Sequence, residues 1–306
     1  MNKVLKYICE PWRILVAFDR HILSIVPDKL YLKALYRSIT GRKLDLKNPK
    51  TFCEKMQWLK LYNRRPEYTQ LVDKYLAKKH IANTLGEEFV FPLLGKWDSF
   101  DDIDFSSLPN QFVLKCNHVS VSTKIIYQGS LSNEKKEELR TFYTRRLKKD
   151  FYKIGREYPY KGIKKCIIAE KYMVDEEKPD QGINDYKFLC FNGIPKIMYV
   201  ATDRKTDCRF DFFDMDFHHL PIENTHPNSD RTINKPSLFD EMKAIAAKLS
   251  AGMPFIRVDL YEINGRIFFS ELTFFHCGGV YLFKPEEWER RLGDWIVLPD
   301  KYCQRK

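Results

Sequence analysis

Two Asn-Gly dipeptides constrain the fold of this chain more than any other feature. Asn192-Gly193 and Asn264-Gly265 each lie between runs of apolar residues. Asn-Gly suits the two positive-φ positions of a tight turn, so each dipeptide predicts a β-hairpin. We therefore expect sheets in which most neighbouring strands are antiparallel.

The apolar pattern divides the chain into a helical beginning and a mixed remainder. Before residue 85, helical spacing predicts helices at 31–39, 52–61 and 68–83, and Thr51 with Glu54 forms a capping box for the second. Further helices are expected at 133–154 and 237–250. Strands are expected at 89–94, 112–116, 166–173, 186–191, 194–201, 256–263 and 267–273. The predicted class is α+β.

The positive charge of the chain is concentrated in one segment. The chain has 52 Lys and Arg against 41 Asp and Glu, and Glu134 to Lys171 holds thirteen basic residues against six acidic ones. Much of this charge lies on one face of the expected helix 133–154, for which Asn133 is the expected cap. Either that face is merely solvated, or it meets phosphate on a nucleotide, a lipid-linked substrate or an anionic membrane. No nucleic-acid-binding motif accompanies the charge, so nucleic acid is not an expected partner.

Composition excludes several classes of protein. With 44% hydrophobic residues in a chain of 306, a disordered polyelectrolyte is excluded. No apolar run approaches the roughly 18 residues that a membrane-spanning helix needs. The eight cysteines form no CxxC pair, which favours a reduced cytosolic compartment with the thiols as small core residues.

The second hairpin carries two carboxylates whose convergence depends on loop length. With a two-residue turn, Asp259 lies beside Ser270 and Glu271 falls on the opposite face. With a three-residue loop, 263–265, the two carboxylates share one face, and we prefer this register because the opposite face is then largely apolar. The shared face carries Arg257, Asp259, Glu271 and Thr273. Neighbouring carboxylates suit Mg²⁺, and a solvent-facing hairpin with an ion pair is the alternative.

These residues resemble the metal-binding hairpin of ATP-grasp enzymes, which reads R-x-D followed by E-x-N. Other segments are similar to the TupA-like branch of that family, found among polysaccharide-assembly genes. They are residues 48–63, 72–81, 91–118, 167–173, 185–195, 257–274 and 292–299. The resemblance implies an ATP-grasp-like fold with two α+β subdomains clasping a nucleotide, here 89–173 and 174–306, after a helical N-terminal region, 1–88.

The resemblance also implies functional residues. Lys115 matches a lysine that contacts ATP phosphates. Lys187 matches a basic residue that points into the nucleotide cleft between the subdomains. The linker facing the adenine matches Glu170, Lys171, Tyr172 and Met173. The magnesium ligands match Asp259, Glu271 and Thr273, and Arg257 matches a neighbour that stabilises charge developing on the transferred phosphoryl group.

The expected phosphate loop departs from the family pattern. The family commonly has Gly-Ser-Gly after Asn-His, whereas this chain has Val119 to Ser122 there. Valine disfavours positive φ, so side chains are the expected donors to phosphate. These candidates are His118, Ser120, Ser122 and Lys124.

The resemblance implies an ATP- and Mg²⁺-dependent ligase that activates a carboxylate as an acyl phosphate and joins it to an amine. The expected reaction joins an amino acid to a uronic acid in cell-surface polysaccharide biosynthesis. The expected partners are ATP, a polysaccharide precursor or lipid-linked sugar, and an anionic membrane surface, for a protein in the cytoplasm or peripheral at the inner membrane face.

Two other functions stay open. The first is a glycosyltransferase of the same pathway. Its D-x-D motif would be Asp214 to Asp216, but no predicted strand clearly ends at these residues. The second is a catalytically degenerate nucleotide-binding protein, which Val119 and Val121 favour.

Overall fold

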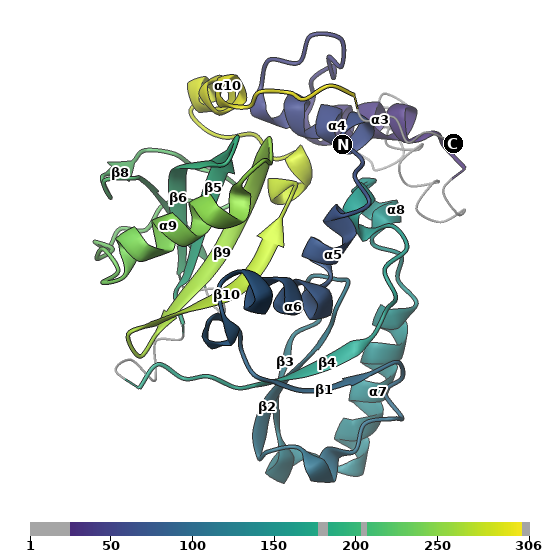
Figure 1. Ribbon diagram of the computed structural model, residues 1–306. Coiled ribbons are helices and arrows are strands. Elements are labelled where there is room, and N and C mark those ends of the chain that lie inside the picture. The colour runs from purple at the N-terminus through teal and green to yellow at the C-terminus, as the bar shows by residue number, and fades with distance from the viewer. Residues whose placement is uncertain (1–24, 177–182, 203–206, 302–306) are drawn as a thin grey trace.

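The computed structural model describes residues 25–176, 183–202 and 207–301. Within these ranges the chain forms a four-stranded sheet, a six-stranded sheet and covering helices (Figure 1). Every paired strand is antiparallel, so the predicted class and pairing are confirmed. Residues 1–24 of the expected helical region lie outside the described part, and so do Cys9 and Cys303.

The first described helices are those that the apolar spacing predicts. They are α3 (Asp28–Thr40), α4 (Phe52–Tyr62), α5 (Tyr68–Val72) and α6 (Lys74–Thr84). The capping box of Thr51 and Glu54 is present at α4. Asp73 divides the third predicted helix into α5 and α6, because its carboxylate accepts the backbone N–H groups of Tyr75 and Leu76 as a new N-cap.

The four-stranded sheet has the order β1-β4-β2-β3. Its strands are β1 (Leu93–Trp97), β2 (Gln111–Cys116), β3 (Lys124–Tyr127) and β4 (Ile167–Lys171). Helix α7 (Asn133–Leu147) packs on it through Leu139 and Tyr143, which join an apolar cluster with residues of β2, β3 and β4. The short helix α8 (Tyr152–Gly155) follows.

The six-stranded sheet has the order β10-β9-β5-β6-β7-β8. Its strands are β5 (Asp185–Phe191), β6 (Ile194–Thr202), β7 (Arg209–Asp214), β8 (His219–Leu220), β9 (Phe255–Ile263) and β10 (Arg266–Thr273). Helix α9 (Phe239–Ser250) covers the face that carries Phe188, since the rings of Phe239 and Phe188 are 5.9 Å apart. Lys187 therefore belongs to the opposite face.

Both Asn-Gly dipeptides form tight turns, so the two predicted hairpins are confirmed. Asn192 and Gly193 have φ of 51° and 82°, and Asn264 and Gly265 have 51° and 66°. Short 3₁₀ helices complete the chain: η1 (Glu87–Phe89), η2 (Phe105–Ser107), η3 (Gln128–Ser130), η4 (Tyr158–Tyr160) and η5 (His276–Gly279). The last helix is α10 (Glu286–Trp295).

The helices before residue 85 share one core with the six-stranded sheet. Tyr31, Phe52, Met56 and Ile81 belong to the same buried cluster as Phe188 and other residues of β5 to β10. Figure 1 shows α5 and α6 running down from the upper helices into the space between the two sheets. Lys248 of α9 donates a 2.8 Å hydrogen bond to the carbonyl of Thr84 at the end of α6.

Several predicted elements were wrong in extent. The basic helix ends at Leu147, because the polar residues 148–150 interrupt its apolar stripe, and its N-cap is Ser132. The strand predicted at 89–94 begins only at Leu93, since Pro92 has no N–H to donate to a ladder. The prediction missed β3, β7, β8 and α10. Each is short or rich in charged or aromatic residues, so its apolar periodicity is weak.

Four of the six described cysteines, at 53, 116, 166 and 190, are buried as predicted, while Cys208 and Cys277 are partly exposed. Among the residues described, no helix combines the length and apolar character needed to cross a bilayer.

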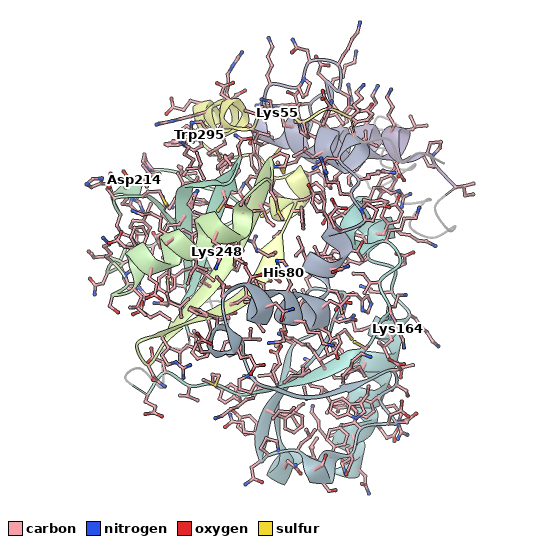
Figure 2. All side chains as sticks on the ribbon, viewed as in Figure 1. Lys55, His80, Lys164, Asp214, Lys248 and Trp295 are labelled. Atoms are coloured by element: carbon pink, nitrogen blue, oxygen red, sulfur yellow. The ribbon has the colours of Figure 1, made fainter. Side chains whose placement is uncertain are left out.

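Helix α10 packs closely against the start of α4. Lys55 of α4 donates to the carbonyl of Ile296 at 2.8 Å, and Figure 2 shows Lys55 and Trp295 on these neighbouring helices. Gly293 faces the backbone before α4, where a Cβ would lie 2.2 Å from the carbonyl oxygen of Lys50.

We expect Gly293→Ala to lower the free energy of unfolding by about 2 kcal/mol, because backbone cannot rotate away from the added methyl group. The loss would outweigh the higher helix propensity of alanine. The control is Gly129→Ala, whose added Cβ would meet nothing within 4 Å, and we expect a change below about 0.5 kcal/mol there. Urea unfolding of the unaltered protein and the two variants measures these free energies. Equal stabilities of Gly293→Ala and Gly129→Ala would contradict the close helix contact.

Candidate functional site

The acidic hairpin brings its two carboxylates together, but not through the preferred register. Its loop is the two-residue turn, with Arg266 paired to Ile263, so the three-residue loop was wrong. A bulge at Ser270 then shifts the pairing, and Glu271 lies opposite Asp259. A bulge places one extra residue in one strand, which restores the shared face that a plain two-residue hairpin lacks.

Arg257 joins the two carboxylates. Its Nε and Nη2 donate to the two oxygens of Asp259 at 2.6 and 2.7 Å, and Nη2 also donates to Glu271 Oε1 at 3.1 Å. Thr273, opposite Arg257 in the ladder, donates a long hydrogen bond of 3.4 Å to the same Glu271 oxygen. The four residues expected on one face therefore form one connected group.

Lys187 adds a second cation to this group from the neighbouring strand β5. It lies directly opposite Asp259, forms an ion pair with it, and is 2.7 Å from Asp185. Burial alone would raise the pKa of the fully buried Asp259, but Arg257 and Lys187 outweigh burial and hold that pKa below its usual value. We name Asp185, Lys187, Arg257, Asp259 and Glu271 the ion cluster.

The four-stranded sheet contributes a second charged group. Glu170 of β4 is buried and forms ion pairs with Lys78 of α6 at 2.8 Å and with Lys115 of β2 at 2.7 Å. Burial alone would raise the pKa of Glu170, but the two lysines outweigh it and lower that pKa. Burial lowers the pKa of Lys78 to about 8. Glu170 thus holds Lys115 in place at its sheet.

Lys74, which the sequence analysis did not single out, lies between the two groups. It is the first residue of α6, and burial lowers its pKa while the charges of Glu271 and Glu170 oppose that shift. It therefore feels a carboxylate from each sheet. The sequence of segment 72–81 does contain a signal for Lys74. Asp73 is a favourable N-cap, and an N-cap there makes Lys74 the first residue of the helix.

The expected phosphate loop uses much of its polarity internally. Ser122 accepts the backbone N–H of Cys116 at 3.0 Å, and Nδ1 of the buried His118 is 3.2 Å from Asn117 Oδ1. Burial lowers the pKa of His118 to about 4, so this ring is neutral at physiological pH. Ser120 and Lys124 are exposed, with Lys124 Nζ 5.1 Å from the ring centre of Phe142. Of these four candidates, only Ser120 and Lys124 reach solvent.

Val121 has a positive φ of 54° and is 80% exposed. The turn thus requires the left-handed backbone that glycine supplies in the family pattern, although a valine occupies it. A β-branched residue in this region is strained by about 1–2 kcal/mol.

The expected adenine linker leads from the first sheet toward the second. Lys171 ends β4, and its N–H donates to the carbonyl of Pro92 at 3.0 Å. Tyr172 and Met173 are half-buried. The Asn264 side chain of the second hairpin accepts from the N–H of Glu176 at 2.8 Å, so linker and hairpin are tied together.

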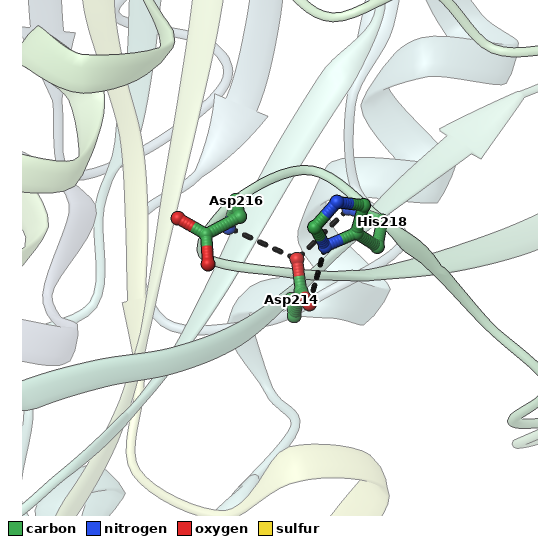
Figure 3. A group of neighbouring side chains, drawn as sticks. All are labelled: Asp214, Asp216 and His218. Atoms are coloured by element: carbon green, nitrogen blue, oxygen red, sulfur yellow. Dashed lines mark hydrogen bonds and ion pairs between the residues drawn. The ribbon is translucent and has the colours of Figure 1, made fainter.

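The D-x-D residues lie at the turn between β7 and β8, away from the ion cluster in the sheet order. Asp214 is the last residue of β7, so the expectation that this motif lacks a strand end was wrong. Figure 3 shows Asp214 with Asp216 and His218, three residues whose ligand atoms lie within 4.8 Å of one another. Asp214 Oδ1 accepts the backbone N–H groups of Asp216 and His218, so the turn itself uses this carboxylate.

The family model described as TupA-like ATPgrasp matches residues 54–297 of the chain. The chain belongs to the TupA-like ATP-grasp family. The match includes both sheets and helices α5 to α10, together with most of α4. This TupA-like protein thus has the ATP-grasp fold that the hairpin suggested.

A search of curated proteins finds no significant match. Comparison with solved structures finds distant similarities. The D-alanine–D-alanine ligase from Bacillus anthracis in complex with ATP is 16% identical, with 66% of this chain and 53% of that chain covered and a TM-score of 0.37. The RimK domain ATP-grasp protein from Sphaerobacter thermophilus is 10% identical, with coverage of 77% and 70% and a TM-score of 0.40. This TupA-like chain spans about half the length of the D-alanine–D-alanine ligases from Bacillus anthracis.

For Val121→Gly we expect a free energy of unfolding that is unchanged or higher by up to about 1 kcal/mol. Relief of the left-handed strain is partly offset by the greater freedom of glycine in the unfolded chain. The matched control is Val119→Gly in the same loop, which removes a buried side chain and should cost about 2–3 kcal/mol. Thermal or urea unfolding tests this, and similar losses in both variants would argue against a left-handed residue 121.

Proposed function

We propose that this chain is an ATP- and Mg²⁺-dependent ligase that activates a carboxylate as an acyl phosphate and joins it to an amine. Family membership supports the reaction class. The observation that carries the proposal is a set of cations contributed by both sheets. Lys187 and Arg257 pair with Asp259 in the six-stranded sheet, and Lys115 pairs with Glu170 in the four-stranded sheet. Lys74 interacts with the charges of Glu271 and Glu170 and so links the two groups. A triphosphate carries several negative charges, and such a set of cations offsets them.

In this proposal the residues of the two sheets divide the work. Lys115 and Lys187 contact phosphate oxygens, and the segment from Glu170 to Met173 faces the adenine. Arg257 stabilises charge that develops on the transferred phosphoryl group. Residues 89–173 and 174–306 are the two subdomains around the nucleotide, and residues 1–88 precede them.

The carboxylates fit a magnesium ion in part. Among the residues described, Glu271 Oε2 has no hydrogen bond or ion pair. In contrast, both oxygens of Asp259 already accept from Arg257, and one also from Lys187. Glu271, Asp259 and Thr273 would hold the ion, which supplies neutralisation of phosphate charge. Phosphate oxygens offer Lys187 another partner, and an oxygen of Asp259 is then released for coordination.

For the substrates we propose an amino acid and a uronic acid within a cell-surface polysaccharide precursor or a lipid-linked sugar. A carboxylate is a poor electrophile at neutral pH, and an acyl phosphate provides the leaving group that an amine can displace. We place the reaction in the cytoplasm, with peripheral contact at the inner membrane face. The TupA-like family and its association with polysaccharide assembly support this choice.

The proposed nucleotide site predicts the effect of removing its lysines. Lys115→Met and Lys187→Met should each weaken MgATP binding roughly 10- to 100-fold in calorimetric titration, since each loses a charge-assisted contact. Lys196→Met is the control, because Lys196 is exposed on the adjacent strand β6. Glu271→Gln should weaken binding only when Mg²⁺ is present.

Turnover is measured as ADP release with a uronic acid and an amino acid, and hydroxylamine should trap the acyl phosphate as a hydroxamate. Binding of a nucleotide sugar instead of ATP, lost in Asp214→Asn, would favour the glycosyltransferase. Tight MgATP binding without ADP release or hydroxamate, across a panel of carboxylates, would favour the degenerate nucleotide-binding protein.

We also propose that the end of α7 meets an anionic membrane. Its beginning is charge-balanced, because Lys135 pairs with Glu138 and Arg140 with Glu137. The excess charge lies after it, at Arg145, Arg146, Lys148 and Lys149.

Changing these last four residues to glutamine should abolish sedimentation with vesicles that contain phosphatidylglycerol, because each basic residue near such a surface contributes about 1 kcal/mol. A Lys135→Gln, Arg140→Gln variant should still sediment. Binding that is absent in the unaltered protein, or unchanged in the fourfold variant, would contradict the membrane contact.

A further inference from the structure

Arg257 has a third side-chain partner, which lies outside the acidic hairpin. Its Nη1 lies 3.1 Å from Nδ1 of His276, the first residue of η5. A guanidinium has five N–H groups. Four are used by Asp259, Glu271 and His276, and within the described ranges the second N–H of Nη1 has no partner. That remaining N–H is the donor that a substrate oxygen can use.

The tautomer of His276 follows from its other neighbour. Asn224 donates through Nδ2 to the carbonyl of Tyr281 at 2.8 Å, which leaves its Oδ1 as the acceptor 3.1 Å from His276 Nε2. The proton therefore lies on Nε2, and Nδ1 has the lone pair that accepts from Arg257. The Cys277 thiol is 3.5 Å from Nε2, and a thiol is a weaker partner than an amide oxygen.

The surroundings keep this histidine neutral and fixed. His276 and Asn224 are each 1% exposed, and the His276 ring stacks on Phe283 at 5.6 Å. Burial lowers the pKa of His276 well below its usual value, and the charges of Arg257 and Lys187 lower it further. A neutral acceptor binds Nη1 without cancelling the positive charge of Arg257.

We propose that His276, oriented by Asn224, is a positioning residue that holds the Arg257 guanidinium so that its remaining Nη1–H points to an oxygen of the transferred phosphoryl group. The carboxylates bind the Nε and Nη2 edge of the guanidinium, and His276 binds the other end. Together they prevent the guanidinium from pivoting about Asp259. The catalytic part of this inference rests on the proposed function.

The first test reads the tautomer and needs no turnover. In protein labelled with ¹⁵N-histidine, the ring signal that disappears in His276→Phe should show a protonated Nε2 and an unprotonated Nδ1 between pH 6 and 8. A protonated Nδ1, or an imidazolium, in this range would overturn the inference, because neither form can accept from Arg257.

The second test separates positioning from packing. His276→Phe keeps a ring against Phe283 but removes the acceptor, and kcat should fall roughly 10- to 100-fold while the KM for ATP stays within about threefold. His276→Asn, which can present an oxygen near the position of Nδ1, should recover part of kcat. Positioning would be contradicted if kcat in His276→Phe equalled that of the unaltered protein. It would also be contradicted if kcat in His276→Asn were no higher than in His276→Phe.

Failure of the proposed function is distinguishable from failure of this inference. If the unaltered protein shows no ATP-dependent turnover with any carboxylate, the ligase proposal fails, while the ring-nitrogen signals still decide whether His276 accepts from Arg257.

Discussion

The buried carboxylate of Asp259 is held between cations from two strands, and the candidate site is arranged around it. A fully buried charge is costly unless it is paired and hydrogen-bonded. Arg257 lies two residues before Asp259 on β9, whereas Lys187 of β5 pairs with Asp259 only in the observed register of β5 and β9. Packing of the central sheet and electrostatics of the ion cluster therefore favour the same alignment, since a one-residue slip would move Asp259 to the apolar face.

Helix α6 makes the two sheets parts of one site. Its Lys78 is paired with Glu170 of the four-stranded sheet. Its half-buried Lys74 lines a small cavity together with Glu271 and interacts with the charges of Glu271 and Glu170. The helix itself belongs to the core of the six-stranded sheet through Ile81. Movement of one sheet relative to the other would separate charges that are buried together, so the two charged groups are electrostatically coupled through this helix.

Agreement between sequence and structure was closest where a local rule was strong. Both Asn-Gly hairpins, the capping box of Thr51 and Glu54 and the antiparallel class were confirmed, because each depends on a few adjacent residues. The hairpin shows the limit of local rules. The predicted shared face was found, but through a bulge at Ser270 in the body of the strand rather than a bulge in the loop. The basic helix was predicted too long because the apolar spacing continues to Phe151, whereas the polar residues 148–150 interrupt the helix.

The sequence by itself determined the α+β class, the two hairpins and, through the resemblance of its segments, the family. Hairpin geometry placed Arg257, Asp259 and Glu271 on one face, because residues within a hairpin meet by short-range geometry, and the resemblance added Lys187 as a candidate. Only the tertiary structure placed Lys74 beside Glu271 and His276 beside Arg257 and Asn224. These contacts join segments that are distant along the chain, and their geometry depends on how helices and loops pack over the sheets. No periodicity or local spacing encodes that packing.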